Sequence, residues 1–207
     1  MRREVSRAVL LTAGLISYDL LCYYGTTRQA PALTTGLALA PAILIVTGLA
    51  WRARGRAGAL IAALACASAL WPLWQLLTRH FPLLLLAQQL SMWGVLFLMF
   101  ARTLRAGRVP LCTEWADRLH GPLTSAERRY TRRVTLAWSL FFAGMGFIGA
   151  LLFLIAPPHY WSAFNHLWAL PLVALMFLGE YVVRHVALPT TAHAGLLAAL
   201  RLYAARR

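Results

Sequence analysis

Six apolar stretches separated by short polar connectors constrain most strongly what this chain can fold into. Each approaches the roughly 20 residues that a helix needs to cross a hydrocarbon core of about 30 Å. The stretches cover residues 8–24, 32–50, 57–78, 83–101, 134–156 and 166–188. We therefore expect an all-α polytopic membrane protein whose six transmembrane helices form a single integral membrane domain over residues 1–207.

The arginines predict how these helices are oriented. The chain has 20 basic residues against 6 acidic ones, and all the basic residues are arginines because lysine is absent. With six spans, every arginine except Arg28 and Arg79 falls on one side of the membrane. The positive-inside rule places that side, and both chain termini, in the cytoplasm. We expect the first span to be retained; the alternative is a signal peptide, because residues 30–32 resemble a cleavage site.

The residue inventory excludes several kinds of chemistry. Without lysine, the chain cannot form a Walker-A phosphate loop, a Schiff base or a pyridoxal-phosphate attachment. We expect no metal site and no cofactor, because the six histidines lack the close spacing of metal ligands. Cys22, Cys66 and Cys112 are unpatterned, so no disulfide is expected. Nucleic acid is not an expected partner, because the arginines flank apolar spans and belong to no soluble domain.

Two short helices are expected on the membrane surface. In the long cytoplasmic connector, residues 102–133, Leu111, Trp115 and Leu119 follow one another at intervals of four. This spacing is typical of an interfacial amphipathic helix. The cytoplasmic tail, residues 189–207, has apolar residues at helical spacing and predicts a second such helix.

The end of the connector predicts a helix start followed by a basic face. Thr124 and Glu127 have the spacing of a capping box, so the fifth long helix should begin before the membrane. Arginines follow on this extension, beside Tyr130, and could bind a lipid headgroup, a phosphopantetheine phosphate or an acidic carrier protein. Alternatively, they serve only as the positive-inside signal. The candidate anion-binding residues are Arg128, Arg129, Tyr130, Arg132 and Arg133.

Ionisable residues inside the spans are the other functional candidates, because charge within a membrane is costly. Glu180 and Arg184 are four residues apart on one helix and can pair, with Tyr181 and His185 beside them. Asp19 has no nearby cation on its own helix, so it must face a cavity, a partner helix or the outer interface, or else be protonated. A purely structural role is the alternative for both places. Further polar residues are expected to form interhelical hydrogen bonds: Gln88, Gln89, Asn165 and His166.

Two segments carry a family resemblance. Residues 129–142 (RYTRRVTLAWSLFF) and 177–184 (FLGEYVVR), with Trp161 and Asn165 between them, resemble a family of small bacterial inner-membrane proteins. Members of that family are often encoded beside acyl carrier proteins and ketosynthases in clusters for aryl polyene pigments, such as xanthomonadin, or acyl lipids. The resemblance covers mainly residues 102–184. It implies a place in the inner membrane and a role in polyene or acyl-lipid assembly, and it supplies no catalytic residues.

These observations lead to one functional expectation and two alternatives. We expect an inner-membrane accessory protein for aryl polyene or acyl-lipid biosynthesis, with membrane lipids and an acyl carrier protein as partners. The cytoplasmic arginines would dock the carrier protein or a lipid headgroup. The first alternative is a transporter or flippase of an amphiphilic lipid or pigment, proton-coupled through Asp19 and Glu180. The second is a membrane transferase whose active site follows no familiar motif.

Overall fold

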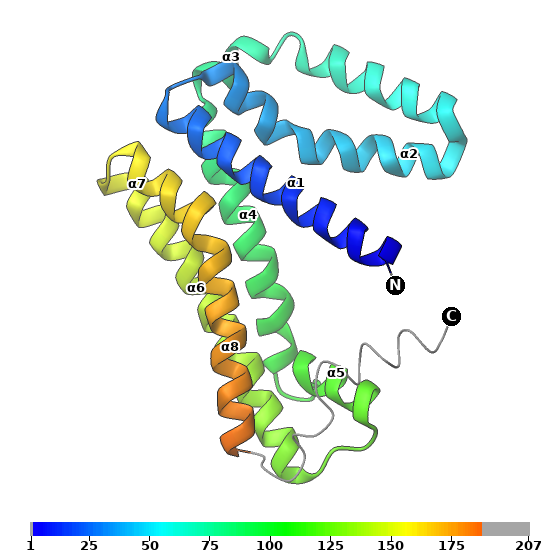
Figure 1. Ribbon diagram of the computed structural model, residues 1–207, viewed down its shortest axis with the longest axis vertical. Coiled ribbons are helices and arrows are strands. Elements are labelled where there is room, and N and C mark those ends of the chain that lie inside the picture. Colours follow the sequence, from blue (N-terminus) through cyan, green and yellow to red (C-terminus); the bar gives the residue numbers. More distant parts are fainter. Residues whose placement is uncertain (1, 188–207) are drawn as a thin grey trace. The chain divides into compact units, whose positions relative to one another are not determined.

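The computed structural model describes residues 2–187, which form helices and no strand (Figure 1). The predicted interfacial helix of the C-terminal tail lies outside the described residues. The helical elements, in chain order, are α1 (Arg2–Thr27), α2 (Pro31–Leu70), α3 (Trp74–Arg79), α4 (Phe81–Ala101), a 3₁₀ turn η1 (Arg102–Leu104), α5 (Leu111–His120), α6 (Ser125–Ile155), α7 (Pro158–Ala163), a π-helical turn η2 (Phe164–Trp168) and α8 (Ala169–Ala187).

The described helices fit a membrane protein. Four of them are long and apolar enough to cross a bilayer: Pro31–Leu70, Phe81–Leu104, Ser125–Ile155 and Pro158–Ala187. Many of their large apolar side chains remain exposed in the isolated chain, such as Leu44, Leu64 and Leu154 at 70% or more. Apolar surface of this extent is what a surrounding lipid phase would cover. The six-span topology stays a prediction.

The second predicted span and most of the third lie within α2. The connector between them is helical except at Gly55, whose φ of 65° and ψ of −154° interrupt the helix. Only glycine adopts this backbone conformation readily. Gly58 lies beside the interruption, where a Cβ would come within 2.7 Å of the Ala50 carbonyl oxygen. The element therefore consists of two helical arms, and Figure 1 shows the second arm turning back from the first.

Pro72 marks the end of the second arm. The predicted third span, residues 57–78, is interrupted at residues 71–73, and the short helix α3 follows. Because proline lacks a backbone N–H and its ring clashes with the preceding turn, it ends helices at such positions. The chain therefore breaks completely at Pro72, between two helices.

The described chain forms two compact units. Of the described residues, the first unit contains 2–90 and 149–169, and the second contains 91–148 and 170–187. In the first unit, Ala38, Phe81, Leu85 and Trp161 form a buried apolar core. The second unit contains α5 and the larger parts of α4, α6 and α8.

Aromatic side chains hold the second unit together. The ring of Trp138 on α6 lies 4.6 Å from Phe177 on α8 and 6.4 Å from Phe100 on α4. Phe142, one turn further along α6, packs edge-on against Phe100 at 5.2 Å and stacks with Trp93 at 6.1 Å. Aromatic pairs at these distances contribute roughly 0.5–1.5 kcal/mol each beyond their buried area. They fix α4 and α8 against the same helix, α6.

Candidate functional site

The start of α6 is fixed by the predicted capping box. The Thr124 hydroxyl donates to Glu127 Oε2 at 2.7 Å, and the Thr124 N–H donates to the same oxygen at 2.7 Å. In return, the Glu127 N–H donates to Thr124 Oγ1 at 3.3 Å. These bonds satisfy donors that a helix start otherwise leaves unpaired. The prediction is confirmed, and α6 begins nine residues before Val134.

The predicted helix of the connector is α5, and threonines join it to α6. The hydroxyls of Thr113 and Thr131 lie 2.7 Å apart, and the Cys112 N–H donates to Thr135 Oγ1 at 3.2 Å. Burial raises the pKa of the Cys112 thiol. On α5, Trp115 and Leu119 remain more than half exposed. The helix itself is confirmed, while its place on a membrane surface stays a prediction.

The two sequence regions that we singled out for function meet at Glu180. Arg184 donates Nε and Nη2 to Glu180 Oε1 at 3.0 and 2.8 Å, and Nη2 also lies 2.7 Å from Oε2. Tyr130 on α6 donates its hydroxyl to Glu180 Oε1 and to the Glu180 carbonyl oxygen, both at 3.2 Å. The Glu180 side chain is only 12% exposed. The predicted ion pair is confirmed, and Tyr130 connects it to a second helix.

The other residues beside the pair lie outside this arrangement. The rings of Tyr181 and His185 pack against each other at 4.2 Å, and both side chains are exposed. His185 Nδ1 lies 2.9 Å from the Tyr181 carbonyl oxygen. Neither residue lines the apolar cavity between α6 and α8.

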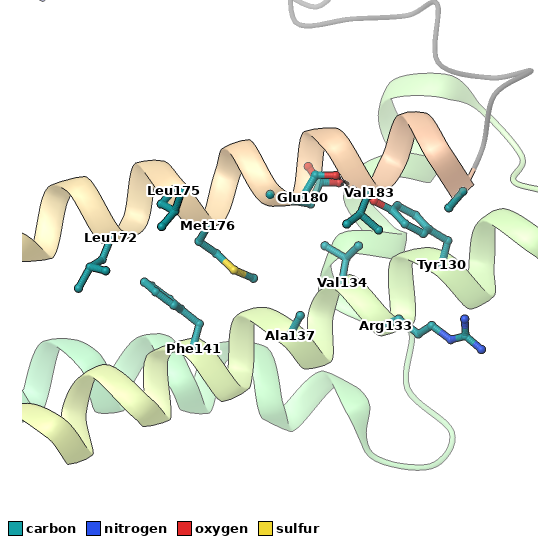
Figure 2. A pocket seen from close by; sticks show the side chains of 12 residues that line it. Tyr130, Arg133, Val134, Ala137, Phe141, Leu172, Leu175, Met176, Glu180 and Val183 are labelled. Atoms are coloured by element: carbon teal, nitrogen blue, oxygen red, sulfur yellow. Dashed lines mark hydrogen bonds between the residues drawn. The ribbon is translucent and has the colours of Figure 1, made fainter.

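An apolar cavity of about 520 Å³ lies between α6 and α8, next to the Tyr130–Glu180 contact (Figure 2). Phe141 from α6 and Leu172 and Met176 from α8 point into it. Apart from Tyr130, Arg133 and Glu180, its lining is apolar. We call this space the α6–α8 cavity; its remaining lining residues are Val134, Ala137, Leu175, Gly179, Val183 and Ala187.

The predicted arginine face divides into two groups. Arg128 forms an ion pair with Asp117 on α5 at 3.3 Å and donates to the Leu123 carbonyl oxygen. The other three line a second hollow of about 290 Å³, together with two leucines. We call this hollow the arginine recess; its lining residues are Leu104, Arg129, Arg132, Arg133 and Leu136.

Arg133 lines both hollows, so the arginine recess adjoins the α6–α8 cavity. Figure 2 shows its guanidinium pointing away from Phe141 and Met176. Arg132 is held in place by its Nη2, which donates to the Leu104 carbonyl oxygen at 3.2 Å. The site therefore combines an apolar space with a neighbouring group of cations.

Asp19 has a partner on another helix, in the first unit. His166 Nδ1 lies 3.5 Å from Asp19 Oδ1, with the two side chains 14% and 25% exposed, respectively. His166 belongs to the π-helical turn η2, a type of irregularity often found at functional sites. Asp19 does not line the α6–α8 cavity. We expected an interhelical partner for His166 and a partner helix for Asp19, but the sequence did not connect them.

The other polar predictions within the first unit have mixed outcomes. Gln89 accepts a hydrogen bond from Trp161 Nε1 at 3.1 Å, which confirms an interhelical role. Asn165 instead donates to the Trp161 carbonyl oxygen, four residues earlier in its own helical segment, at 2.9 Å. Its predicted contact with another helix is not seen among the described residues.

Comparisons with models of protein families, with curated proteins and with solved structures found no match to this chain.

Proposed function

We propose that this chain is an inner-membrane protein that binds the acyl or polyene chain of an amphiphile during acyl-lipid or aryl polyene assembly. The observation that supports this proposal is the α6–α8 cavity. It is apolar along its length and has polar side chains at one end, as the binding site of a molecule with a hydrocarbon tail and a polar head would.

The carboxylate of Glu180 at the polar end of the cavity is neutralised by its partners, which suits such a ligand. Glu180 is paired with Arg184 and also accepts from Tyr130, so a hydrocarbon chain would meet no unpaired carboxylate there. In a bilayer, lipid tails are as apolar as the cavity wall, so transfer of the tail provides little driving force. Selectivity must then come from the shape of the cavity and from its polar end. Under this proposal the arginines that line the arginine recess receive the carrier protein or the headgroup.

Photocrosslinking of the purified full chain would test the proposal. A palmitic acid analogue with a diazirine near the end of its tail should label peptides of α6 and α8. Ala137→Phe should reduce this labelling at least severalfold, because Ala137 lines the cavity. Leu140→Phe is the matched control, since Leu140 lies on the same helix, is 63% exposed and does not line the cavity. Equal labelling of the two variants would contradict the proposal.

Proton-coupled transport of the same amphiphile is the second candidate. It is supported by the Asp19–His166 pair, because an acid and a histidine within the helices are the groups that proton relays use. In proteoliposomes, Asp19→Asn should abolish movement of a labelled amphiphile driven by a pH gradient. Normal movement in that variant would exclude this mechanism.

A further inference from the structure

We infer that the arginine recess binds the phosphate of the amphiphile whose hydrocarbon chain occupies the α6–α8 cavity. This inference rests on the proposed function and specifies the head of its ligand. It makes the recess and the cavity two parts of one binding site, joined at Arg133.

The first argument is the distribution of charge around the recess. No acidic residue lines it, although three arginines do. Elsewhere in the second unit, three arginines form ion pairs, Arg118 with Glu114, Arg128 with Asp117 and Arg184 with Glu180. Among the described residues, Arg102, Arg105 and Arg108 form none, but they line neither of the two hollows. Among the described residues, Arg129, Arg132 and Arg133 form no such ion pair. Cations that share a hollow without an anion repel one another, and a bound anion removes that repulsion.

The second argument is the match between guanidinium groups and phosphate. Each guanidinium presents several N–H donors in a planar fork that fits two phosphate oxygens, and the resulting charge-assisted bonds are stronger than neutral ones. Arg132 already donates one N–H to the Leu104 carbonyl oxygen, which orients the group while leaving further donors. The exposure of all three arginines leaves the recess open to a ligand.

The third argument is the continuity of the two hollows. Arg133 is the only residue lining both of them, so a phosphate at its guanidinium lies next to the opening of the apolar cavity. The nearest acid in the cavity wall, Glu180, is neutralised by Arg184 and would repel the phosphate little. Free phosphate has the same head chemistry but no tail to use the cavity. The geometry therefore favours an alkyl phosphate over inorganic phosphate.

Binding of dodecyl phosphate and dodecanol to the full chain, purified in a neutral detergent, tests the inference. Dodecyl phosphate should bind at least tenfold more tightly than dodecanol, because hydrogen bonds to charged groups contribute about 1.5–3 kcal/mol each, or roughly tenfold or more in Kd. The double variant Arg132→Gln/Arg133→Gln should lose most of this preference. Arg128→Gln is the control: it removes one positive charge from the same helix, against two in the double variant, and Arg128 is paired with Asp117. It should change the Kd less than about threefold.

The alternative outcomes separate the inference from the proposed function. If the change in log Kd for Arg128→Gln is half or more of the change for the double variant, the effect is one of overall surface charge and the inference is overturned. Inorganic phosphate binding as tightly as dodecyl phosphate would also overturn it. If both variants still bind dodecyl phosphate but the double variant no longer binds an acidic carrier protein, the recess is a protein-docking surface instead. If dodecyl phosphate binds no more tightly than dodecanol, and Ala137→Phe blocks both while the double variant blocks neither, the proposed function stands and the inference is refuted.

Discussion

Removal of the Tyr130 hydroxyl should weaken the attachment of α8 to α6 through Glu180. Tyr130→Phe deletes two hydrogen bonds of 3.2 Å, which are longer than the typical 2.7–2.8 Å of an O–H···O bond. Bonds to a charged group contribute about 1.5–3 kcal/mol. The two bonds of Tyr130 share a single hydroxyl hydrogen, and the Glu180 carboxylate is already paired with Arg184. We therefore expect Tyr130→Phe to lower the free energy of unfolding by only about 1–1.5 kcal/mol.

A double-mutant cycle with Glu180→Gln isolates the contribution of the contact. Arg184, which is 44% exposed, can be solvated by water when Glu180 loses its charge. The coupling between Tyr130→Phe and Glu180→Gln should therefore reflect mainly the hydroxyl–carboxylate bond, at about 0.5–1.5 kcal/mol. The four proteins would be unfolded by increasing mole fractions of sodium dodecyl sulfate in mixed micelles, with helix content followed by circular dichroism.

Tyr181→Phe provides the matched control for this cycle. Tyr181 is adjacent to Glu180, is 53% exposed, and its hydroxyl has no hydrogen bond among the described residues. Its coupling to Glu180→Gln should stay below about 0.5 kcal/mol, the usual error of additivity. A coupling for Tyr130 that is no larger than the one for Tyr181 would refute the view that Tyr130 links the two helices through this carboxylate.

Three further perturbations test other parts of the chain. Gly55→Ala should lower the free energy of unfolding by about 1–3 kcal/mol, because φ is 65° there; Gly48→Ala, with open space around its Cβ position, should be close to neutral. Gly149→Ala should lower the free energy of unfolding by about 1–3 kcal/mol through overpacking, because the added Cβ would collide with the Gln89 side chain that accepts a hydrogen bond from Trp161. Gly144→Ala on the same helix is the control, because its Cβ would meet nothing within 4 Å. With its pKa raised by burial, the Cys112 thiol should react with N-ethylmaleimide more slowly in the folded than in the unfolded chain. The difference between the two rates should narrow as the pH rises and the folded thiol ionises.

The features that the sequence predicted well are local ones. Thr124 and Glu127 are three residues apart, and Glu180 and Arg184 are four apart on one helix. Helical geometry alone brings such pairs together, whatever surrounds them. The break at Pro72, which interrupts the predicted third span, is local as well, because proline disrupts a helix through its own ring and its missing donor.

The contacts that the sequence did not predict join residues from different helices. Tyr130 and Glu180 are 50 residues apart, and their contact depends on how far α6 is rotated and shifted against α8. That register is set by packing, here by the rings of Trp138 and Phe177 one to two turns away. The same holds for Asp19 and His166, which a π-helical turn brings together. Hydropathy and the spacing of charges along the sequence do not determine how two helices are rotated against each other. They therefore identified these residues but not the contacts between them.

The positive-inside rule does not explain which arginines of α6 are paired with acids and which are not. That rule requires arginines near the ends of apolar spans, and any spacing among them would satisfy it. It does not require three of them to line one hollow while Arg128, in the same run, is paired with Asp117. With 6 acids against 20 arginines, the chain cannot pair them all, and Arg102, Arg105 and Arg108 are also without an ion pair among the described residues. The recess arginines differ from these because the three of them share one hollow. Those lining the recess are unpaired at the point where an apolar cavity begins, which is where an amphiphile places its charge.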